Sequence, residues 1–377
     1  MKLVLVISSL GGGGAERVMA TLANAWAIEG HEVTLITFSD AEHDRYKLVP
    51  QVDRVALSVA TESRNIIDGF INNVGRIRAL RGIISSRRPD AVVSFMTRTN
   101  LLTILSCRGL GIPVIASERV YFGANPAHGI WKLLFRPIYR AAASIVAQTE
   151  RGALDLGARL GRPVVVIQNP VSGALSGGTA RASPSTQDII LAMGRMEKQK
   201  GFDLLIEAFS RIATAHPSWN LVILGEGPER KVLEAQIERS GMKDRIGMPG
   251  FCEAPAEMMR QARVFVLSSR YEGLPNALME AMASGLACVS FDCLTGPAEL
   301  IQHEVNGLLV PSEDVVSLAG ELERCMGDAD LRARLGSAAT SSLQPYSLAS
   351  VMEKWARLLQ DVRAPLKRNF QQRTTVR

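Results

Sequence analysis

The stretch from residue 264 to residue 285 constrains the fold of this chain more than any other. It opens with an apolar run over 264–269, which is typical of a strand buried on both faces of a parallel sheet. Pro275 then suits the first turn of a helix, and Gly285 stands where a glycine commonly follows a helix end. The stretch therefore predicts strand, loop and helix, in an α/β domain that binds ligands at the carboxyl ends of its strands.

Two carboxylates flank the predicted start of this helix. Glu272 lies in the loop and Glu280 on the second helical turn. The expected N-cap residue, Leu274, has no side-chain oxygen to accept from the first-turn N–H groups, so this helix end suits a bound anion. Carboxylates accept hydrogen bonds from sugar hydroxyls while amides hold phosphates, so the combination favours a nucleotide sugar. The alternative is that both glutamates are solvated residues near a helix start, where acidic residues are common.

With its neighbours, the stretch resembles the E-x7-E motif of the retaining glycosyltransferases of family 4. The resemblance implies the GT-B fold, in which two Rossmann-like parallel-sheet domains of the α/β class face each other across a cleft. It implies a catalytic role for Glu272. It also implies that donor-binding residues lie in this stretch: Gly273, Leu274, Pro275, Asn276, Ala277 and Glu280.

A second motif follows a predicted strand at 188–193. Arg195 and Lys200 lie in a loop whose pattern, Gly-Arg-x-x-x-x-Lys-Gly, resembles the loop with which the family holds the donor diphosphate. Without the resemblance, a basic pair in a loop is simply solvated. In the later loop at 225–228, the glycines permit a tight turn near the nucleotide, which predicts a donor contact at Gly225. The loop at Gly250 and Phe251 cups the nucleotide base in relatives, so the resemblance implies donor contacts at these two residues.

The glycine-rich loop after the first predicted strand has two interpretations. It partly matches the dinucleotide fingerprint G-x-G-x-x-G, but Glu16 stands where the third glycine belongs, which weakens the case for a nicotinamide enzyme. Residues 13–17, Gly-Gly-Ala-Glu-Arg, match the family loop that faces the donor diphosphate and the acceptor. The resemblance therefore implies donor contacts at Gly13 and Gly14 and an acceptor-side role for Glu16.

Arg119 departs from the family pattern. Many relatives place a histidine directly after the Ser-Glu pair that here is Ser117 and Glu118. Arginine cannot act as a base, because its pKa exceeds 12. We expect Arg119 to lie on the acceptor side and to donate to the leaving phosphate or to an anionic acceptor.

The length of 377 residues is enough for two domains with separate cores. We predict a first domain over 1–170, a Gly/Ser/Ala-rich linker over 171–187 and a donor domain over 188–345. A last helix over 346–362 is expected to return to the first domain, and the basic tail 363–377 is expected to be disordered.

Charge is distributed unevenly along the chain. Residues 1–170 carry a net +7, residues 171–362 a net −6, and residues 363–377 five basic residues and no acid. This argues against a nucleic-acid partner and favours an anionic membrane surface for the first domain. Two segments are candidates for that contact. The first is a basic helix over 70–88, with an apolar stripe (Ile71, Val74, Ile77, Leu80, Ile84) and five arginines elsewhere (Arg76, Arg78, Arg81, Arg87, Arg88). The second spans 121–140 and mixes Trp131, Phe135 and Tyr139 with basic residues. Both suit core-facing helices equally well.

Other classes of site are disfavoured. Five cysteines without metal-ligand spacing favour a reduced compartment, and no run reaches the about 18 apolar residues of a membrane span. Asp328 and Asp330 imitate a D-x-D metal site, but they lie between two helical patterns and are better explained as helix caps. We expect no metal and no cofactor.

The expected function is therefore transfer of a sugar, with retained anomeric configuration, from a nucleotide diphosphate donor. The resemblance implies a uridine diphosphate sugar as donor and a glycan acceptor linked to a polyprenyl lipid, used in bacterial surface polysaccharide assembly at the cytoplasmic face of the inner membrane. Three alternatives stay open: a non-catalytic subunit that binds nucleotide sugars, a sugar epimerase of the same fold, and a phosphorylase. The last would need a lysine for pyridoxal phosphate, and no lysine suggests that role.

Overall fold

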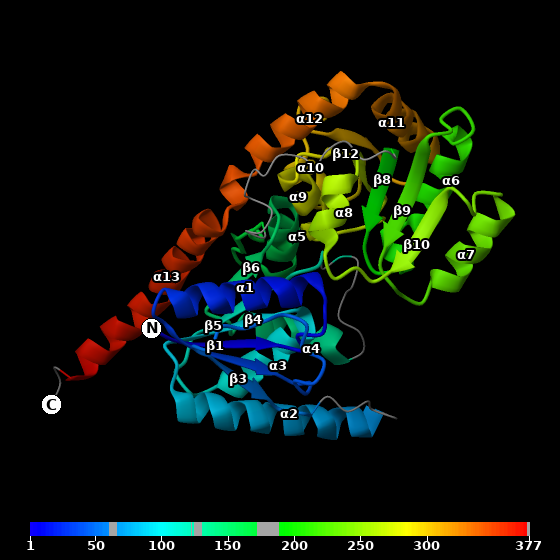
Figure 1. The fold of residues 1–377 in the computed structure, drawn as a ribbon. Coiled ribbons are helices and arrows are strands. Elements are labelled where there is room, and N and C mark those ends of the chain that lie inside the picture. Colours follow the sequence, from blue (N-terminus) through cyan, green and yellow to red (C-terminus); the bar gives the residue numbers. More distant parts are fainter. Residues whose placement is uncertain (60–65, 122, 124–129, 172–187, 375–377) are drawn as a thin grey trace. The chain divides into compact units, whose positions relative to one another are not determined.

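The computed structural model describes residues 1–59, 66–121, 123, 130–171 and 188–374. It forms two compact units (Figure 1), the first of Met1–Asn169 with Val351–Arg377 and the second of Pro170–Ser350. The sequence placed the domain boundary at residue 170 and returned the last helix to the first domain; the structure has the chain pass between the units after Asn169 and after Ser350. Of the predicted linker, residues 172–187 lie outside the described residues.

A parallel sheet of seven strands forms the centre of the first unit, in the order β3-β2-β1-β4-β5-β6-β7. Its first strands are fully buried beyond the opening residue because apolar residues run without alternation, as a sheet covered on both faces requires. The elements of this part of the chain are β1 (Lys2–Ile7), α1 (Gly14–Ile28), β2 (Glu32–Thr37), β3 (Val52–Ala56), α2 (Ile66–Arg87), β4 (Ala91–Phe95), α3 (Thr97–Cys107), β5 (Val114–Ser117), α4 (Ile130–Tyr139), β6 (Ser144–Ala147), α5 (Glu150–Leu160) and β7 (Val165–Val166).

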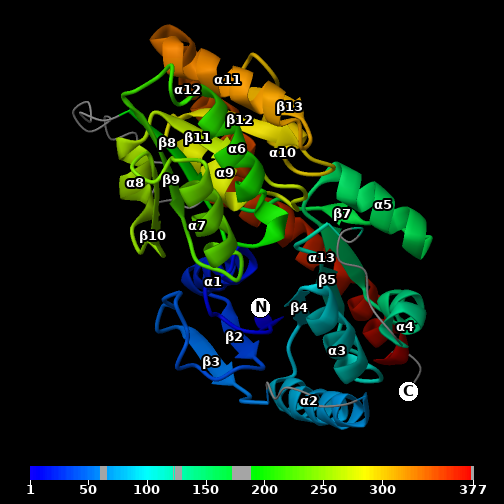
Figure 2. The same ribbon diagram turned by 90° about the vertical axis from the view of Figure 1, so that its right-hand side faces the viewer.

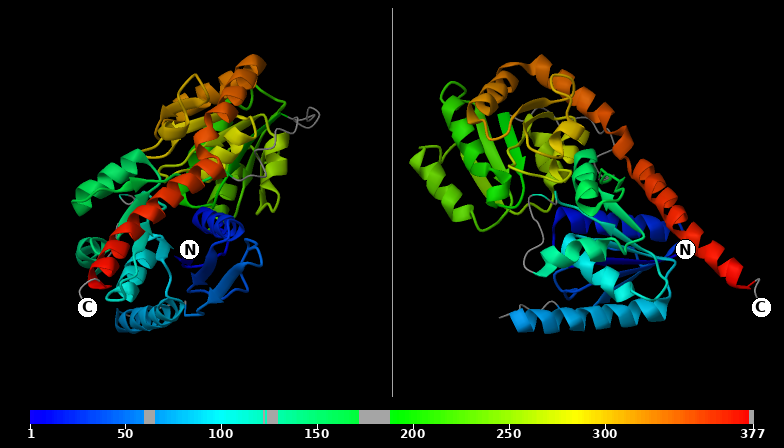
Figure 3. Two further views of the ribbon diagram at one scale, coloured as in Figure 1. Left: turned by 90° about the vertical axis from the view of Figure 1, so that its left-hand side faces the viewer. Right: turned by 180° about the vertical axis from the view of Figure 1, so that it is seen from behind.

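Helices α2, α3 and α4 lie side by side on one face of this sheet (Figure 2), and one hydrophobic core joins them to the strands. The last helix, α13 (Leu348–Thr374), also belongs to this unit from Val351 onward, and Figure 3 shows that part lying along it. Trp355 of α13 is fully buried, with its ring centroid 5.8 Å from that of Trp26 on α1 and 6.4 Å from that of Phe95 on β4.

The second unit repeats the design with six parallel strands in the order β10-β9-β8-β11-β12-β13. From β8 the chain builds outward to β9 and β10, then returns to β11 on the other side of β8. Its elements are β8 (Asp188–Met193), η2 (Lys198–Lys200), α6 (Phe202–Ile212), β9 (Trp219–Leu224), α7 (Arg230–Arg239), β10 (Ile246–Gly250), α8 (Pro255–Gln261), β11 (Val264–Leu267), α9 (Asn276–Ala283), β12 (Ala287–Asp292), α10 (Pro297–Leu300), β13 (Leu308–Pro311), α11 (Val315–Gly327), α12 (Ala329–Ser342) and η3 (Gln344–Tyr346).

The basic helix α2 buries the predicted apolar stripe at Leu80 and Ile84, with Ile77 packed against the core, but departs from the prediction at two positions. Ile71, expected on the apolar stripe, is 61% exposed, whereas Arg76, expected at the surface, is 6% exposed. Arg76 is tolerated inside because its Nε donates to the carbonyl of Val59 at 3.0 Å and its Nη1 to Oδ1 of Asn73 at 3.1 Å. Arg81 is also hydrogen-bonded within the unit, because its Nη1 donates to the carbonyl of Ser106 at 2.9 Å.

Two further expectations change with the structure. In α4, Phe135 and Tyr139 are buried in the core, so these aromatic rings are not surface groups; Leu133 is exposed instead. Helix α13 continues to Thr374, through most of the segment predicted as a disordered tail. Among the described helices, none combines the length and the apolar character that crossing a membrane requires.

Candidate active site

An ion pair between Lys200 and Glu272 lies at the point where the strand order of the second sheet reverses, between β8 and β11. Lys200 comes from the loop after β8 and Glu272 from the loop after β11, two neighbouring strands. Lys200 Nζ is 2.5 Å from Glu272 Oε1, and the two side chains are 20% and 8% exposed. Ser269 Oγ donates to the same carboxylate oxygen at 2.7 Å. Open α/β sheets bind their ligands at this switch point, outside the carboxyl ends of the strands.

The two loops that carry the pair are tied together through their backbones. Ser268 Oγ donates to the carbonyl of Lys200 at 2.9 Å, and Gln199 Nε2 donates to the carbonyl of Tyr271 at 2.8 Å. The backbone N–H of Arg270 donates to the carbonyl of Gln199 at 2.8 Å. These contacts fix the position of Lys200 relative to Glu272 before any ligand arrives, which reduces the ordering cost of binding.

Arg270 anchors the same loops from the outside. Its guanidinium contacts Asp203 of α6 through two hydrogen bonds of 2.8 and 2.7 Å, and its Nε lies 3.0 Å from Glu313. The hydrogen bond with Asp203 raises the pKa of Arg270. Burial alone would raise the pKa of Asp203, but the hydrogen bonds and charge of Arg270 more than reverse this and hold it below its usual range. Arg270 is a scaffold residue, and its place at the start of the Glu272 loop is the one sequence signal for it.

Two glycines allow the loops to approach this closely. Gly201 has φ +61°, and a Cβ there would lie 2.0 Å from the carbonyl oxygen of Ser268. Gly225 has φ +136°, and a Cβ there would lie 1.9 Å from the carbonyl oxygen of Gly194. Neither position accepts a side chain without backbone movement.

Helix α9 begins one residue later than predicted. Its N-cap residue is Pro275, which makes no side-chain cap hydrogen bond, and Leu274 is buried in the core of the unit, which draws it out of the capping position. Asn276 and Ala277 form the half-buried first turn. Glu280 lies on the second turn as predicted and is 2% exposed. The helix ends at Ala283, so Gly285, with φ +72°, follows the cap residue in the left-handed conformation typical of a helix end.

The remaining predicted donor residues lie at the same edge of the sheet. The Arg195 side chain is 71% exposed, with Nε 3.0 Å from Oε1 of Glu197. The N–H of Gly225 donates to the carbonyl of Gly250 at 2.8 Å, which joins the loops after β9 and β10. Phe251 is 55% exposed. Gly273 precedes Leu274, and the hydroxyl of Thr295 donates to the carbonyl of Glu272, a contact that the sequence did not predict.

In the first unit, the predicted Gly13, Gly14 and Glu16 form the start of α1. Gly13 is the N-cap, Gly14 the first helical residue and Glu16 the third. A glutamate at that position commonly reaches back to the cap, so Glu16 has a structural role available besides the predicted acceptor contact. Tyr46 OH donates to the carbonyl of Gly13 at 3.0 Å and holds the loop in place.

Arg119 is packed inside the first unit. It is 5% exposed, its guanidinium carbon is 3.7 Å from the ring centroid of Phe95, and its Nη1 donates to Oδ1 of Asn169 at 2.8 Å. Burial lowers the pKa of Arg119 to about 9. Its Nε and Nη2 have no hydrogen-bond partner within the described ranges. The packing on an aromatic ring and the bond to Asn169 are contacts that the predicted acceptor-side role did not include.

No group of three or more His, Cys, Asp and Glu side chains in the described part of the chain could hold a metal ion. Asp328, from the apparent D-x-D sequence, is the N-cap of α12 and accepts from the N–H of Leu331 at 2.8 Å. The capping interpretation of this pair is confirmed for Asp328.

Comparison with known families assigns both units. The family described as "Glycosyltransferase Family 4" matches residues 12–173, and "Glycosyl transferases group 1" matches residues 179–342. The two parallel-sheet units with these matches define a glycosyltransferase of the GT-B class. The chain belongs to glycosyltransferase family 4, with a group 1 second domain, as the resemblance in its motifs implied.

Relatives with this architecture work in bacterial glycan pathways. The GalNAc-alpha-(1->4)-GalNAc-alpha-(1->3)-diNAcBac-PP-undecaprenol alpha-1,4-N-acetyl-D-galactosaminyltransferase of Campylobacter jejuni is 28% identical over 371 residues, covering 96% of this chain and 99% of that protein. The lipopolysaccharide 1,6-galactosyltransferase of Escherichia coli K12 is 28% identical over 268 residues, covering 69% and 72%.

Solved structures share the fold at lower identity. Staphylococcus aureus TarM superposes with a TM-score of 0.80 at 14% identity, covering 95% of this chain and 98% of that one. Anabaena Alr3699/HepE, solved with UDP and glucose, superposes with a TM-score of 0.79 at 18% identity, covering 96% and 99%. The GT-B fold is therefore confirmed.

Proposed function

We propose that the chain is a retaining glycosyltransferase that moves a sugar from a nucleotide diphosphate donor, with uridine diphosphate as the expected nucleotide, to a polyprenyl-linked glycan. The observation that carries the proposal is the Lys200–Glu272 pair at the switch point, beside the uncapped start of α9. A cation, a carboxylate and the amino end of a helix suit a ligand that joins a diphosphate to a sugar.

Each group has a defined task in this proposal. Lys200 and Arg195 stabilise the charge that develops on the diphosphate as it leaves, together with the positive end of α9. Glu272 and Glu280 accept hydrogen bonds from hydroxyls of the donor. Binding of the diphosphate would draw the Lys200 ammonium toward phosphate and release part of the Glu272 carboxylate for the sugar. No metal is needed for this charge stabilisation.

The acceptor proton needs a base, and we propose that the leaving phosphate takes it. None of the predicted catalytic residues is an obvious nucleophile, because Arg195 and Lys200 are cations that serve the phosphate and Glu272 accepts from the sugar hydroxyls. The acceptor oxygen would then form its bond to the anomeric carbon on the same face as the departing phosphate, and the configuration is retained.

Relatives support a lipid-linked acceptor. The name of the Campylobacter jejuni relative described above includes an undecaprenol-linked substrate, and an enzyme with such a substrate would work at a membrane surface. We propose docking of the first unit, at the cytoplasmic face, through apolar side chains on α2 and α4. Phe70 and Leu133 are 70% and 78% exposed, and exposed arginines accompany them on the same helices.

Release of nucleotide diphosphate tests the catalytic proposal. The purified protein is incubated with UDP-glucose, UDP-galactose, their N-acetylamino analogues and GDP-mannose, each with a polyprenyl diphosphate glycan. We expect release with one of the UDP sugars, an α-linked product by NMR, and undiminished activity in excess EDTA. Loss of activity in EDTA with recovery on manganese addition contradicts the metal-independent mechanism. Donor binding without release under all conditions favours the non-catalytic subunit.

A further inference from the structure

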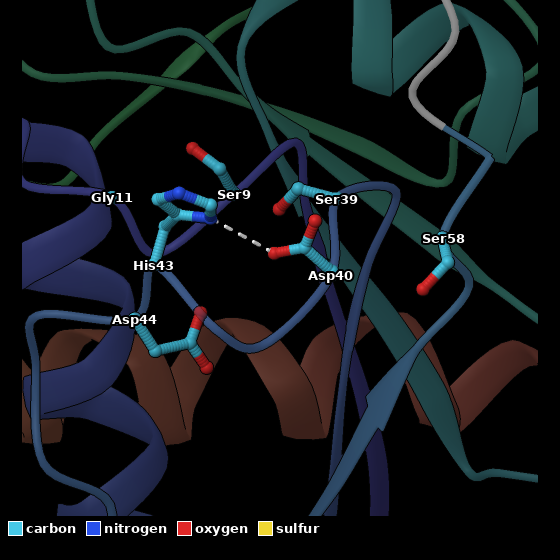
Figure 4. Close-up of a pocket in the computed structure, with 7 residues that line it drawn as sticks. All are labelled: Ser9, Gly11, Ser39, Asp40, His43, Asp44 and Ser58. Atoms are coloured by element: carbon cyan, nitrogen blue, oxygen red, sulfur yellow. Dashed lines mark hydrogen bonds and ion pairs between the residues drawn. The ribbon is translucent and has the colours of Figure 1, made fainter.

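A polar pocket in the first unit is lined by none of the residues that carry the proposed donor chemistry. It encloses about 330 Å³ and lies beyond the carboxyl ends of β1, β2 and β3 (Figure 4). Six residues with polar side chains line it, Ser9, Ser39, Asp40, His43, Asp44 and Ser58, together with Gly11. A pocket of this size with hydroxyl, carboxylate and imidazole groups and no apolar side chain suits one hydroxyl-rich ring.

The walls of the pocket are fixed by contacts behind them. The carbonyl of Ser8 accepts from the N–H groups of Phe38 and Ser39, both at 3.1 Å, which joins the loops after β1 and β2. Arg54 of β3 then forms a two-bond pair with Asp44, with Nε at 2.9 Å and Nη2 at 3.1 Å from its carboxylate oxygens. Both side chains are less than one-fifth exposed. The loop over 40–45 is thereby tied to the sheet.

The two carboxylates of the pocket differ in their ion-pair partners. Arg54 neutralises Asp44. Asp40 contacts His43 Nδ1 at 3.2 Å, and among the described residues no lysine or arginine forms an ion pair with it. In Figure 4 the Asp40 carboxylate and the His43 ring extend toward one another across the pocket. An unneutralised carboxylate repels an anionic ligand and accepts hydrogen bonds from sugar hydroxyls.

We infer that this pocket binds a neutral sugar of the acceptor glycan and rejects acidic sugars, with Asp40 as the residue that sets this choice. The inference rests on the proposed function only where it identifies the bound sugar as part of the acceptor glycan. Binding of the sugar to the pocket needs no nucleotide donor.

Saturation-transfer NMR on the full chain, without nucleotide, tests the inference. The probes are methyl α-galactoside, methyl N-acetyl-α-galactosaminide and the matched acidic probe methyl α-galacturonide. We expect saturation transfer to at least one neutral probe and several-fold weaker transfer to the galacturonide at low salt, because the exposed Asp40 carboxylate repels its charge. Absence of transfer to every probe, or equal transfer to neutral and acidic probes, overturns the inference.

Three variants test whether the sugar binds in this pocket and whether Asp40 excludes the acidic probe. Asp40→Asn removes the charge and keeps the hydrogen-bonding shape, so the galacturonide should bind as well as the neutral probes. Glu42→Gln is the matched control, because Glu42 is an exposed carboxylate of the same loop that does not line the pocket; it should change nothing. Ser39→Tyr should fill the pocket and abolish transfer to all probes. Unchanged transfer in Ser39→Tyr, with a native thermal transition, places the sugar elsewhere and overturns the inference.

The experiment separates this inference from the proposed function. UDP binding by the second unit is measured on the same variants and should be unaffected. A protein that binds neutral glycosides but no UDP sugar refutes the transferase proposal and leaves the pocket intact. A protein that binds UDP sugars and turns them over but binds no probe refutes the pocket.

Discussion

Any substitution of Lys200 changes both the charge of the candidate site and the stability of its loops. The Lys200 ammonium is the ion-pair partner of a carboxylate that is 8% exposed. Lys200→Ala should lower turnover about a hundredfold or more through lost charge stabilisation. It should also lower the free energy of unfolding by about 3 kcal/mol, because Glu272 stays buried without its partner. Steady-state kinetics and chemical denaturation measure the two effects.

A substitution of Arg195 should affect catalysis without affecting stability, because the Arg195 side chain is 71% exposed. Arg195→Ala should reduce turnover to a similar extent while the free energy of unfolding changes by less than about 0.5 kcal/mol. Lys198→Ala is the control for both variants, since Lys198 is an exposed cation of the same turn; it should alter neither quantity. Wild-type turnover in the Lys200 and Arg195 variants would remove the two residues from the site.

The five free cysteines divide into one accessible thiol and four protected ones. Burial raises the pKa of Cys107, Cys293 and Cys325 to about 12 each and raises that of Cys288 as well. Cys252 is partly exposed. Because the thiolate is the reactive form, an aromatic disulfide reagent at pH 8 should modify one thiol per chain rapidly in the native protein and all five in denaturant. Two or more rapid equivalents in the native protein would contradict the structure.

At the level of elements, the sequence predicted best those helices and strands whose bounds depend on residues close in the chain. The strand, loop and helix around Glu272 follow from an apolar run, Pro275 and Gly285, which act on their own neighbourhood. On α2 the apolar pattern predicted the burial of Leu80 and Ile84, but the burial of Arg76 could not be predicted in this way. Arg76 is buried because the carbonyl of Val59, on a distant segment, accepts from it. The Gln199 bond to the Tyr271 carbonyl escaped prediction for the same reason.

The contact between the loops after β8 and β11 predicts a large cost for one glycine substitution. Gly201 and Gly241 have similar left-handed backbones, with φ +61° and +69°, but a Cβ at Gly241 would meet nothing within 4 Å. Gly241→Ala should therefore cost only the conformational term, about 1 kcal/mol. Gly201→Ala should cost at least about 2 kcal/mol more, because its Cβ overlaps the carbonyl of Ser268 and must displace the loop. Urea unfolding of both variants measures the difference, and equal costs would contradict a close approach of the two loops.

For the whole molecule, the last helix should stabilise the first unit selectively. Trp355 is fully buried against Trp26 and Phe95, which both belong to that unit. Trp355→Ala should lower the stability of the first unit by about 3–5 kcal/mol, as removal of a buried aromatic side chain does. Hydrogen exchange followed by mass spectrometry should show faster exchange in β1 and β4 and unchanged exchange in β8 and β11.

Arg357 supplies the control on the same helix, because its side chain is 73% exposed. Arg357→Ala should leave exchange in both units at wild-type rates. Uniform acceleration over the second unit in Trp355→Ala would show that α13 does not act on the first unit alone.

Membrane docking is the prediction that depends on the charge of the whole molecule. The first 170 residues carry a net +7 and residues 171–362 a net −6, so an anionic bilayer attracts one end of the chain. Among the arginines of α2, α4 and the residues that follow them, Arg78, Arg88 and Arg136 are exposed. Others there are held within the unit: Arg76 and Arg81 by hydrogen bonds to carbonyls, Arg87 by an ion pair with Asp53 and Arg140 by a hydrogen bond to the carbonyl of Leu160. Each exposed cation near the surface contributes about 1 kcal/mol, so the binding should be reversible and weakened by salt.

Sedimentation with vesicles of anionic and of neutral lipid measures this binding at low and high salt. The wild type should pellet with anionic vesicles at low salt, and replacing Arg78, Arg88 and Arg136 together with glutamate should leave it in the supernatant. The same charge change on the second unit, at Lys231, Arg239 and Lys243, provides the control and should leave the binding intact, because docking is local to the first unit. Equal loss in both triple variants would mean that net charge alone attracts the chain. A wild type that stays in the supernatant with anionic vesicles at low salt would refute docking altogether, and the lipid-linked acceptor would then have to reach the site without it.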